Sequence, residues 1–245
     1  MVNEIYSKGN EVNNKRQSFT NLSETIQEKI SMFFYKKKTD VFDNIIRNAR
    51  KIANEDPCGL QTLVYSLIRP LQSEQIIQVC ERADHAARSK ITSDTFFSDN
   101  RDFISFEEKK DLRVDPHSEV VDLSRDAVIP TPWQPLSIAE MFASYGEGRK
   151  AGPWRQDNNH SVEFYLPWRI GFVLGGNHSI AAGILRGEGS IKPNYVYDLT
   201  EKLRKVKTDG IDFISVESNK IICPAVNQRV AAIWEIGRMM SNVAN

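Results

Sequence analysis

Two glycines, an asparagine, a histidine and a serine stand together at residues 175–179 of this 245-residue sequence. They follow the apolar residues 170–174 and precede a run of small and apolar residues, so the pattern predicts a strand, a tight turn and a helix starting near Ser179. Glycine has no Cβ, which lets the backbone turn sharply and come close to a ligand. The free N–H groups at a helix start attract phosphate. The sequence therefore predicts an anion-binding turn.

His178 is part of this predicted anion-binding turn, beside the position expected for a phosphate. An imidazole there either donates a hydrogen bond to a phosphate or transfers a proton. Asn177 or Ser179 is expected to cap the helix, because both side chains accept hydrogen bonds from free helical N–H groups. The alternative is an ordinary strand-to-helix turn with a capped helix and a histidine that has no chemical role.

Two further groups of side chains are candidates for the same site. Arg149 and Arg155 belong to a basic, glycine-containing loop that either supplies phosphate-binding cations or is simply exposed. Asp157, His160 and Glu163 carry groups that bind metals or exchange protons, although their spacing matches no established metal motif. The metal, if one is used, is therefore left unassigned.

Two short motifs carry a family resemblance. Gly175-Gly176-Asn177-His178-Ser179-Ile180-Ala181-Ala182 resembles the GGCHRYAA segment of sulfiredoxins and the corresponding GERR-type phosphate box of ParB proteins. Pro132-Trp133-Gln134-Pro135 resembles the N-P-x-Q-P-R element that begins the ParB N-terminal domain. Residues 119–200, roughly, thus resemble the ParB/sulfiredoxin-like superfamily. The resemblance implies a nucleotide-binding cleft in which Gly175, Gly176, Asn177, His178 and Ser179 surround the phosphates, with Gln134 nearby. Arg149 and Arg155 of the basic loop are separate candidates for phosphate-binding cations at this cleft.

Three positions depart from the family pattern. Asn177 stands where sulfiredoxins have their nucleophilic cysteine, so reduction of a cysteine sulfinic acid is not expected. Ser179 and Leu136 stand where the motifs have arginine, which removes two bidentate phosphate ligands. The resemblance therefore implies a nucleotide site and does not select one activity.

The function implied is that of a nucleotide-binding enzyme. It would carry out phosphoryl transfer, or hydrolysis of a nucleotide or phosphodiester, with a nucleoside triphosphate and Mg²⁺ as cofactors. His178 would act as the catalytic residue at the transferred or leaving phosphate. A role in bacterial antiviral defence is suggested by where such variants of the superfamily tend to occur, which is an association and not a chemical argument. The alternative is a non-catalytic module in which nucleotide binding positions the N-terminal helices against DNA or a partner protein; a third is an inactive site.

Composition narrows the partners and the compartment. Thirty-two basic residues balance thirty-two acidic ones, so net charge indicates neither DNA nor an anionic membrane as a partner. The three cysteines show no paired spacing typical of zinc sites or disulfides. No apolar run approaches the length that spans a bilayer, and the N-terminus has no apolar signal core. These features predict a cytoplasmic protein.

The periodicity of apolar residues predicts an α+β fold, with a helical N-terminal region at 1–112 and a small mixed-sheet domain with a C-terminal helix at 113–245. The first region is expected to contain helices near 22–34, 40–52, 60–69 and 73–86, with Pro70 ending the third and Ser73 opening the fourth. Residues 92–118 are expected to form a connector. In the second region, Ser137 is expected to cap a helix at 138–145. Pro167 is expected to place the strand 162–168 at a sheet edge or a bulge. Further strands are expected at 170–174, 195–199, 211–216 and 220–223, and helices at 200–206 and 226–240.

Overall fold

A five-stranded mixed sheet lies at the centre of the structure, a computed structural model that describes residues 40–81 and 91–243. The spatial order of its strands is β1 (Arg113–Val114), β7 (Tyr195–Asp198), β4 (Ser161–Leu166), β5 (Ile170–Gly175) and β3 (Ala127–Ile129). The pairs β1–β7 and β4–β5 are antiparallel, whereas β4–β7 and β3–β5 are parallel. Together with the helices around it, this sheet confirms the predicted α+β class.

Helices and smaller strands surround this sheet. A helix over residues 40–55 confirms the predicted second helix, and the predicted helix at 22–34 lies outside the described residues. The other elements, in chain order, are α2 (Gly59–Cys80), η1 (Arg101–Ile104), α3 (Phe106–Asp111), η2 (Pro116–Ser118), β2 (Val121–Asp122), α4 (Pro135–Ser144), α5 (Asn177–Arg186), β6 (Ser190–Ile191), α6 (Thr200–Lys205), β8 (Val206–Thr208), β9 (Asp212–Ser215), β10 (Ile221–Pro224) and α7 (Gln228–Val243).

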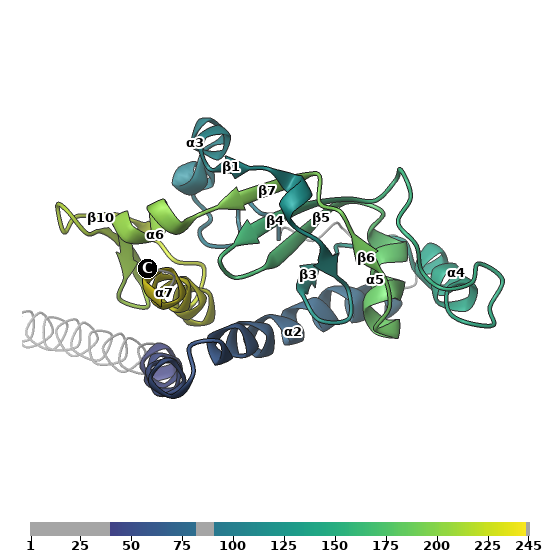
Figure 1. The fold of residues 1–245 in the computed structure, drawn as a ribbon, viewed down its shortest axis with the longest axis horizontal. Helices are drawn as coiled ribbons and strands as arrows, with labels where there is room; N and C mark the ends of the chain where they lie inside the picture. Colours follow the sequence, from purple (N-terminus) through teal and green to yellow (C-terminus); the bar gives the residue numbers. More distant parts are fainter. Residues whose placement is uncertain (1–39, 82–90, 244–245) are drawn as a thin grey trace, which may run out of the picture.

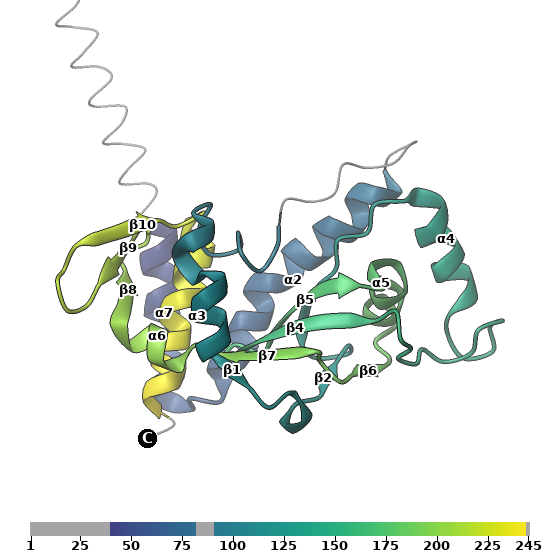
Figure 2. The ribbon, with the colours of Figure 1, turned by 90° about the horizontal axis from the view of Figure 1, so that it is seen from above.

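The two ends of the molecule are built differently. The long helix α2 runs along the sheet (Figure 1). At one end it meets α7, which packs beside the small antiparallel sheet β10-β9-β8. At the other end lie α4 and α5 (Figure 2). The strand β5 runs toward this second end and leads directly into α5, so the predicted anion-binding turn lies there.

Pro70 does not end a helix, and the prediction of two separate helices is wrong. The helix α2 continues through Pro70 to Cys80. Proline lacks the N–H that would bond to the carbonyl of Ser66, but both residues are exposed, so water can satisfy that carbonyl. Continuous burial of one face of α2 outweighs the lost hydrogen bond; its buried residues are Leu60, Val64, Ile68, Gln72, Gln75, Ile76 and Val79.

The segment 92–118 supplies core residues as well as connecting the two halves. Phe96, Phe97 and Phe103 are buried, and the Phe97 ring lies 5.0 Å from that of Trp168 and 5.1 Å from that of Trp234. Residues of α2, this segment, the sheet and α7 form one hydrophobic cluster. The division at residue 112 remains a prediction, and the described residues on its two sides share this core.

Pro167 lies after the strand that it was expected to limit. β4 occupies the middle of the sheet, between β7 and β5, so the edge-strand alternative is wrong. The ladder between β4 and β5 does have an irregularity, but it lies between Ser161 and Val162, at the end of β4 far from Pro167. The last paired residue of β4 is Leu166, which is joined to Pro167 by a cis peptide bond. Because Pro167 stands outside the ladder, its missing N–H removes no inter-strand hydrogen bond.

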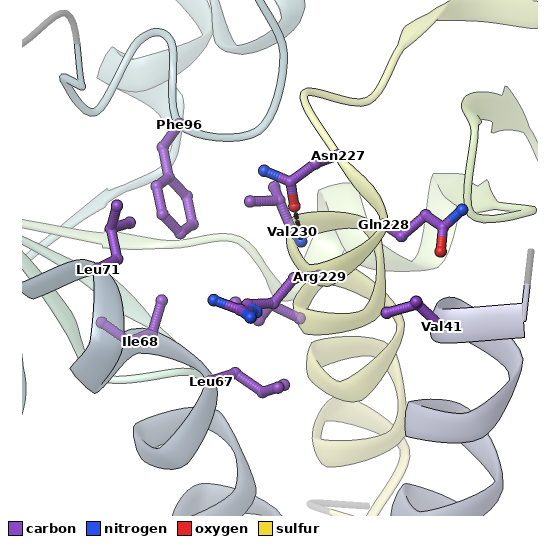
Figure 3. A pocket seen from close by; sticks show the side chains of 10 residues that line it. Val41, Leu67, Ile68, Leu71, Phe96, Asn227, Gln228, Arg229 and Val230 are labelled. Carbon is purple, nitrogen blue, oxygen red and sulfur yellow. Dashed lines mark hydrogen bonds between the residues drawn. The ribbon is translucent and has the colours of Figure 1, made fainter. Parts of the chain in front are cut away.

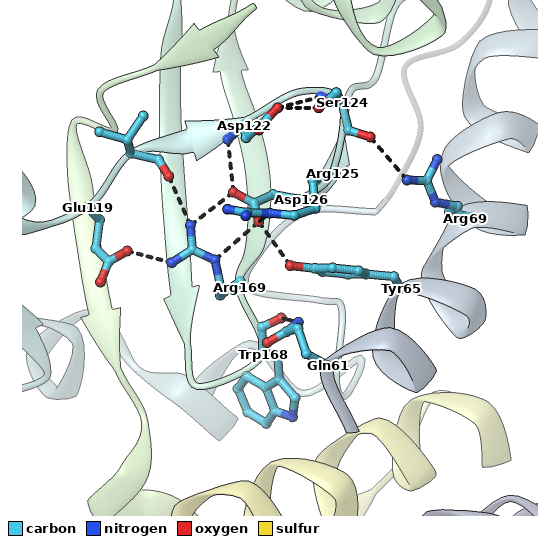
Figure 4. Close-up of polar contacts among 11 residues, drawn as sticks. Gln61, Tyr65, Arg69, Glu119, Asp122, Ser124, Arg125, Asp126, Trp168 and Arg169 are labelled. Atoms are coloured by element: carbon cyan, nitrogen blue, oxygen red, sulfur yellow. Dashed lines mark hydrogen bonds and ion pairs between the residues drawn. The ribbon is translucent and has the colours of Figure 1, made fainter. Parts of the chain in front are cut away.

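An ionic cluster around the buried carboxylate of Asp126 fixes the start of β5 against α2 (Figure 4). Arg169 donates from Nε and Nη2 to the two carboxylate oxygens of Asp126 at 3.1 and 3.0 Å, and from Nη1 to Glu119 at 2.6 Å. Tyr65 of α2 donates to the same Asp126 carboxylate at 2.9 Å. Burial and this carboxylate raise the pKa of Tyr65 to about 12. The cluster thus connects α2, the β2–β3 turn and the residue that precedes β5.

Candidate ligand-binding cleft at the start of α5

A cleft of about 590 Å³ opens where β5 ends and α5 begins. Its walls come from the end of β5, the first turn of α5, the proline-rich segment with α4, and single residues of two loops. The lining residues are Thr92, Thr131, Trp133, Ser137, Met141, Asn159, Val173, Leu174, Gly175, Gly176, Asn177, His178 and Ser179. All five residues of the predicted turn therefore lie on one cleft.

The two glycines are required by the protein itself. Gly176 has a φ of +75°, and a Cβ built there would lie 2.3 Å from Cδ2 of His160. A Cβ on Gly175 would lie 2.6 Å from the carbonyl oxygen of Asn159. The backbone that these glycines approach closely is thus the loop that leads into β4, which contains Asn159 and His160. Gly176 also forms the N-cap of α5, in the left-handed conformation that glycine adopts easily.

The first turn of α5 has no side-chain cap, so the predicted capping by Asn177 or Ser179 is wrong. Asn177 is already helical, and its Oδ1 accepts from the Thr131 backbone N–H at 2.6 Å. Ser179 donates to the carbonyl of Gly176 at 3.1 Å. The first helical hydrogen bond comes from Ile180, so within the described chain the N–H groups of residues 177–179 have no acceptor.

His178 holds the proline-rich segment against α5. Its Nε2 lies 3.4 Å from the backbone nitrogen of Trp133 and 3.2 Å from that of Gln134. Both N–H groups donate, so the ring is neutral and carries its proton on Nδ1. The Trp133 ring meets the imidazole edge to face at 4.6 Å. His178 therefore positions the start of α4, and only its Nδ1–H remains as a donor.

His160 is the neighbouring residue whose role the sequence did not reveal. Its Nδ1 accepts from the Asp157 backbone N–H at 2.8 Å, which leaves Nε2–H to donate to Ser179 Oγ at 2.5 Å. Trp154 covers this pair, since its ring lies 4.7 Å from His160 and its Nε1 donates to the Ser179 carbonyl at 2.8 Å. The first turn of α5 is thus held from the β4 side by a chain of hydrogen bonds.

Both imidazoles make the stability of the protein depend on pH. Burial lowers the pKa of His178. Burial also lowers the pKa of His160, where it outweighs the opposite effect of the Asp157 carboxylate. Below the unfolded-state pKa of about 6.5, the unfolded chain binds more protons than the folded chain, so stability falls as pH falls toward the depressed folded values. We expect urea denaturation to give a lower free energy of unfolding at about pH 5.5 than at about pH 7.5. The variant His178→Gln should lose less over this interval; an equal loss would contradict the assignment.

Glu163 lies away from His160, so the predicted grouping of Asp157, His160 and Glu163 is wrong. Its carboxylate accepts from Ser93 at 2.5 Å and lies 3.6 Å from the Lys109 ammonium on the α2 side of the sheet. No group of three or more His, Cys, Asp or Glu side chains suited to a metal ion occurs among the residues that the structure describes.

Comparison with known proteins places the chain in a family. The model of the family DUF6710 matches residues 7–245. The chain belongs to this family. DUF6710 is described as a family of unknown function, so membership assigns no activity. No curated protein and no solved structure matches the chain. In the described ranges of this DUF6710 member, no helix is long and apolar enough to cross a membrane.

The two arginines predicted to bind phosphate do not line the cleft of this DUF6710 member. Arg149 donates to the carbonyl of Phe142 near the end of α4, and Arg155 is exposed. Gln134 acts through its backbone, as the N-cap of α4, while its side chain accepts from Ser137 at 2.7 Å. Ser137 is therefore not the cap of that helix. The described cleft wall mixes polar and apolar side chains and carries no charged side chain, so the helix dipole is its source of positive potential.

Proposed function

We propose that this cleft binds a nucleotide, with a phosphate on the first turn of α5. The observation that carries the proposal is the set of three N–H groups, at residues 177–179, that have no acceptor in the described chain and line a cleft of about 590 Å³. A helix start of this kind favours an anion through its N–H groups and its dipole. The resemblance of residues 119–200 to the ParB/sulfiredoxin-like superfamily supports a nucleotide as the source of that anion.

The geometry favours binding over catalysis by His178. Its Nε2 already accepts from two backbone N–H groups, and burial lowers the pKa of the imidazole, so a protonated acid at the phosphate is disfavoured. The Nδ1–H is suited to donate a hydrogen bond to a phosphate oxygen. Because no carboxylate lines the described cleft, Mg²⁺ would be held by the nucleotide phosphates and by water.

A nucleotide here would be coupled to the N-terminal helices, which fits a nucleotide-gated module. Asn177 at the ligand turn holds the Thr131 N–H, just after β3. Gln72 of α2 donates to the Val128 carbonyl of β3 at 2.6 Å. In this proposal, nucleotide binding changes how α2 is positioned against a protein partner. The balanced net charge of the chain does not favour DNA as that partner.

The substitution Asn177→Asp tests the phosphate position. Aspartate keeps an acceptor for the Thr131 N–H and suits a helix N-terminus, so the fold should be retained. Its charge should weaken nucleoside triphosphate binding by about tenfold or more and leave nucleoside binding unchanged. Isothermal titration with ATP, CTP, GTP and UTP, with and without Mg²⁺, measures both. The matched control Asn44→Asp adds the same charge on helix 40–55.

Two results would contradict the proposal. One is the absence of binding by any of the four nucleotides; the other is equal nucleotide affinity in wild type and Asn177→Asp. Phosphate release by the wild type that His178→Ala abolishes would instead identify an enzyme. The binding result and the turnover result therefore separate the two functions.

A further inference from the structure

A second concavity, an apolar groove of about 520 Å³, lies between α2, α7 and helix 40–55 (Figure 3). No residue that lines this groove also lines the cleft at α5. Its volume falls within the range of small-molecule sites. Hydrocarbon forms most of the wall, from Val41, Leu67, Ile68, Leu71, Phe96 and Val230.

The polar groups of the groove all come from the start of α7. Asn227 Oδ1 caps this helix by accepting from the Val230 N–H at 3.0 Å. The backbone N–H groups of Gln228 and Arg229 have no acceptor in the described chain. Gln228 is 7% exposed, and its Nε2 is buried without a hydrogen-bond partner. Because Nε2 is buried and the Gln228 amide points away from Leu67 and Ile68 (Figure 3), the donors left for a ligand are the two backbone N–H groups at the start of α7.

Arg229 adds a positive charge to that end. Figure 3 shows its side chain extending from α7 into the space beside Leu67 and Ile68. Among the described residues it makes no hydrogen bond and no ion pair. Arginine presents a planar fork that matches a carboxylate, and the positive end of the α7 dipole acts in the same direction. An anionic group is thus favoured at this position.

We propose that the groove binds a small amphiphilic carboxylate, with its carboxylate on Arg229 and its hydrocarbon chain between α2 and α7. Charge complementarity selects the anionic head, and the side chains of Leu67, Ile68 and Leu71 select the tail. Away from the start of α7, these apolar side chains offer no hydrogen-bond partner for buried amide groups, so a hydrocarbon chain fits this part of the groove better than a peptide backbone does. Nucleotide binding at α5 has no part in this proposal.

The apolar wall and the Arg229 site can be tested separately, the first by the chain length of the ligand and the second by its charge. Isothermal titration of the full chain with hexanoate, octanoate and decanoate should show Kd falling by about tenfold for each two added methylenes, until the groove is filled. Arg229→Gln should weaken octanoate by about tenfold and leave octan-1-ol unchanged, because only the acid uses the guanidinium. Val41→Glu should also weaken octanoate binding, because it places a negative charge on the wall of the groove. Val41 is 51% exposed, so the protein should tolerate that charge.

Arg47→Gln is the matched control, since Arg47 is an exposed arginine of helix 40–55 outside the groove. The absence of binding by all three acids, or unchanged octanoate affinity in Arg229→Gln, would overturn the proposal. So would tighter binding of a peptide with a C-terminal leucine than of decanoate, which would identify a protein terminus as the ligand. Asn177→Asp should leave octanoate binding intact, so failure of the nucleotide site is distinguishable from failure here.

Discussion

Asp126→Ala is expected to lower the free energy of unfolding by about 3–5 kcal/mol, because it removes a buried carboxylate to which Arg169 and two other groups donate. The Asp126 side chain is 0% exposed, and its carboxylate accepts from Arg169, from the Tyr65 hydroxyl and from the Asp122 backbone N–H. Without it, Arg169 keeps its hydrogen bonds to Glu119 and to the Val120 carbonyl, and the half-buried Tyr65 hydroxyl loses its acceptor. Urea denaturation followed by circular dichroism measures the loss.

Arg69→Ala is the matched control for this cluster. Arg69 extends from the same helix to the same turn, where its exposed guanidinium donates to the Ser124 carbonyl at 3.3 Å. An exposed contact of this kind should be worth less than about 1 kcal/mol. If Asp126→Ala costs no more than Arg69→Ala, the cluster does not hold α2 to the sheet.

The elements of this fold were predictable where burial follows a simple period. The strand 170–174, the helix 40–52 and the helix 226–240 each show one apolar face or a continuous apolar run, and the structure places them within a few residues of the expected bounds. Pro70 was misread because local propensity predicts a break, whereas the buried face of α2 on both sides of it keeps the helix continuous. Tertiary packing decided that position.

The candidate cleft was predictable in part for a related reason. The strand, turn and helix at residues 170–185 are adjacent in sequence, so the pattern alone places Gly175 to Ser179 together. His160 contacts this turn only because β4 pairs with β5, with Ser161 opposite Gly175. That register is a long-range property. Arg149 was predicted to reach the cleft and instead donates to α4, since a helix C-terminus offers free carbonyls close by in sequence.

Gly176→Ala is expected to have the largest effect on the cleft itself. A left-handed conformation costs a non-glycine residue roughly 1–2 kcal/mol. The new Cβ would also lie 2.3 Å from the His160 ring, which is 3% exposed and cannot move aside freely. Overpacking of this kind costs about 1–3 kcal/mol more. Displacing His160 would break its bond to Ser179, so nucleotide affinity should fall by about tenfold or more along with stability.

Gly187→Ala separates the two causes, because Gly187 ends the same helix in the same conformation. Its φ is +65°, and a Cβ there would meet no atom within 4 Å. This variant should therefore lose only the roughly 1–2 kcal/mol of backbone strain and keep its nucleotide affinity. Thermal unfolding and isothermal titration of both variants give the comparison. Equal losses of stability and of nucleotide affinity in the two variants would mean that the loop before β4, with His160, does not support the first turn of α5. Backbone strain alone would then explain both results.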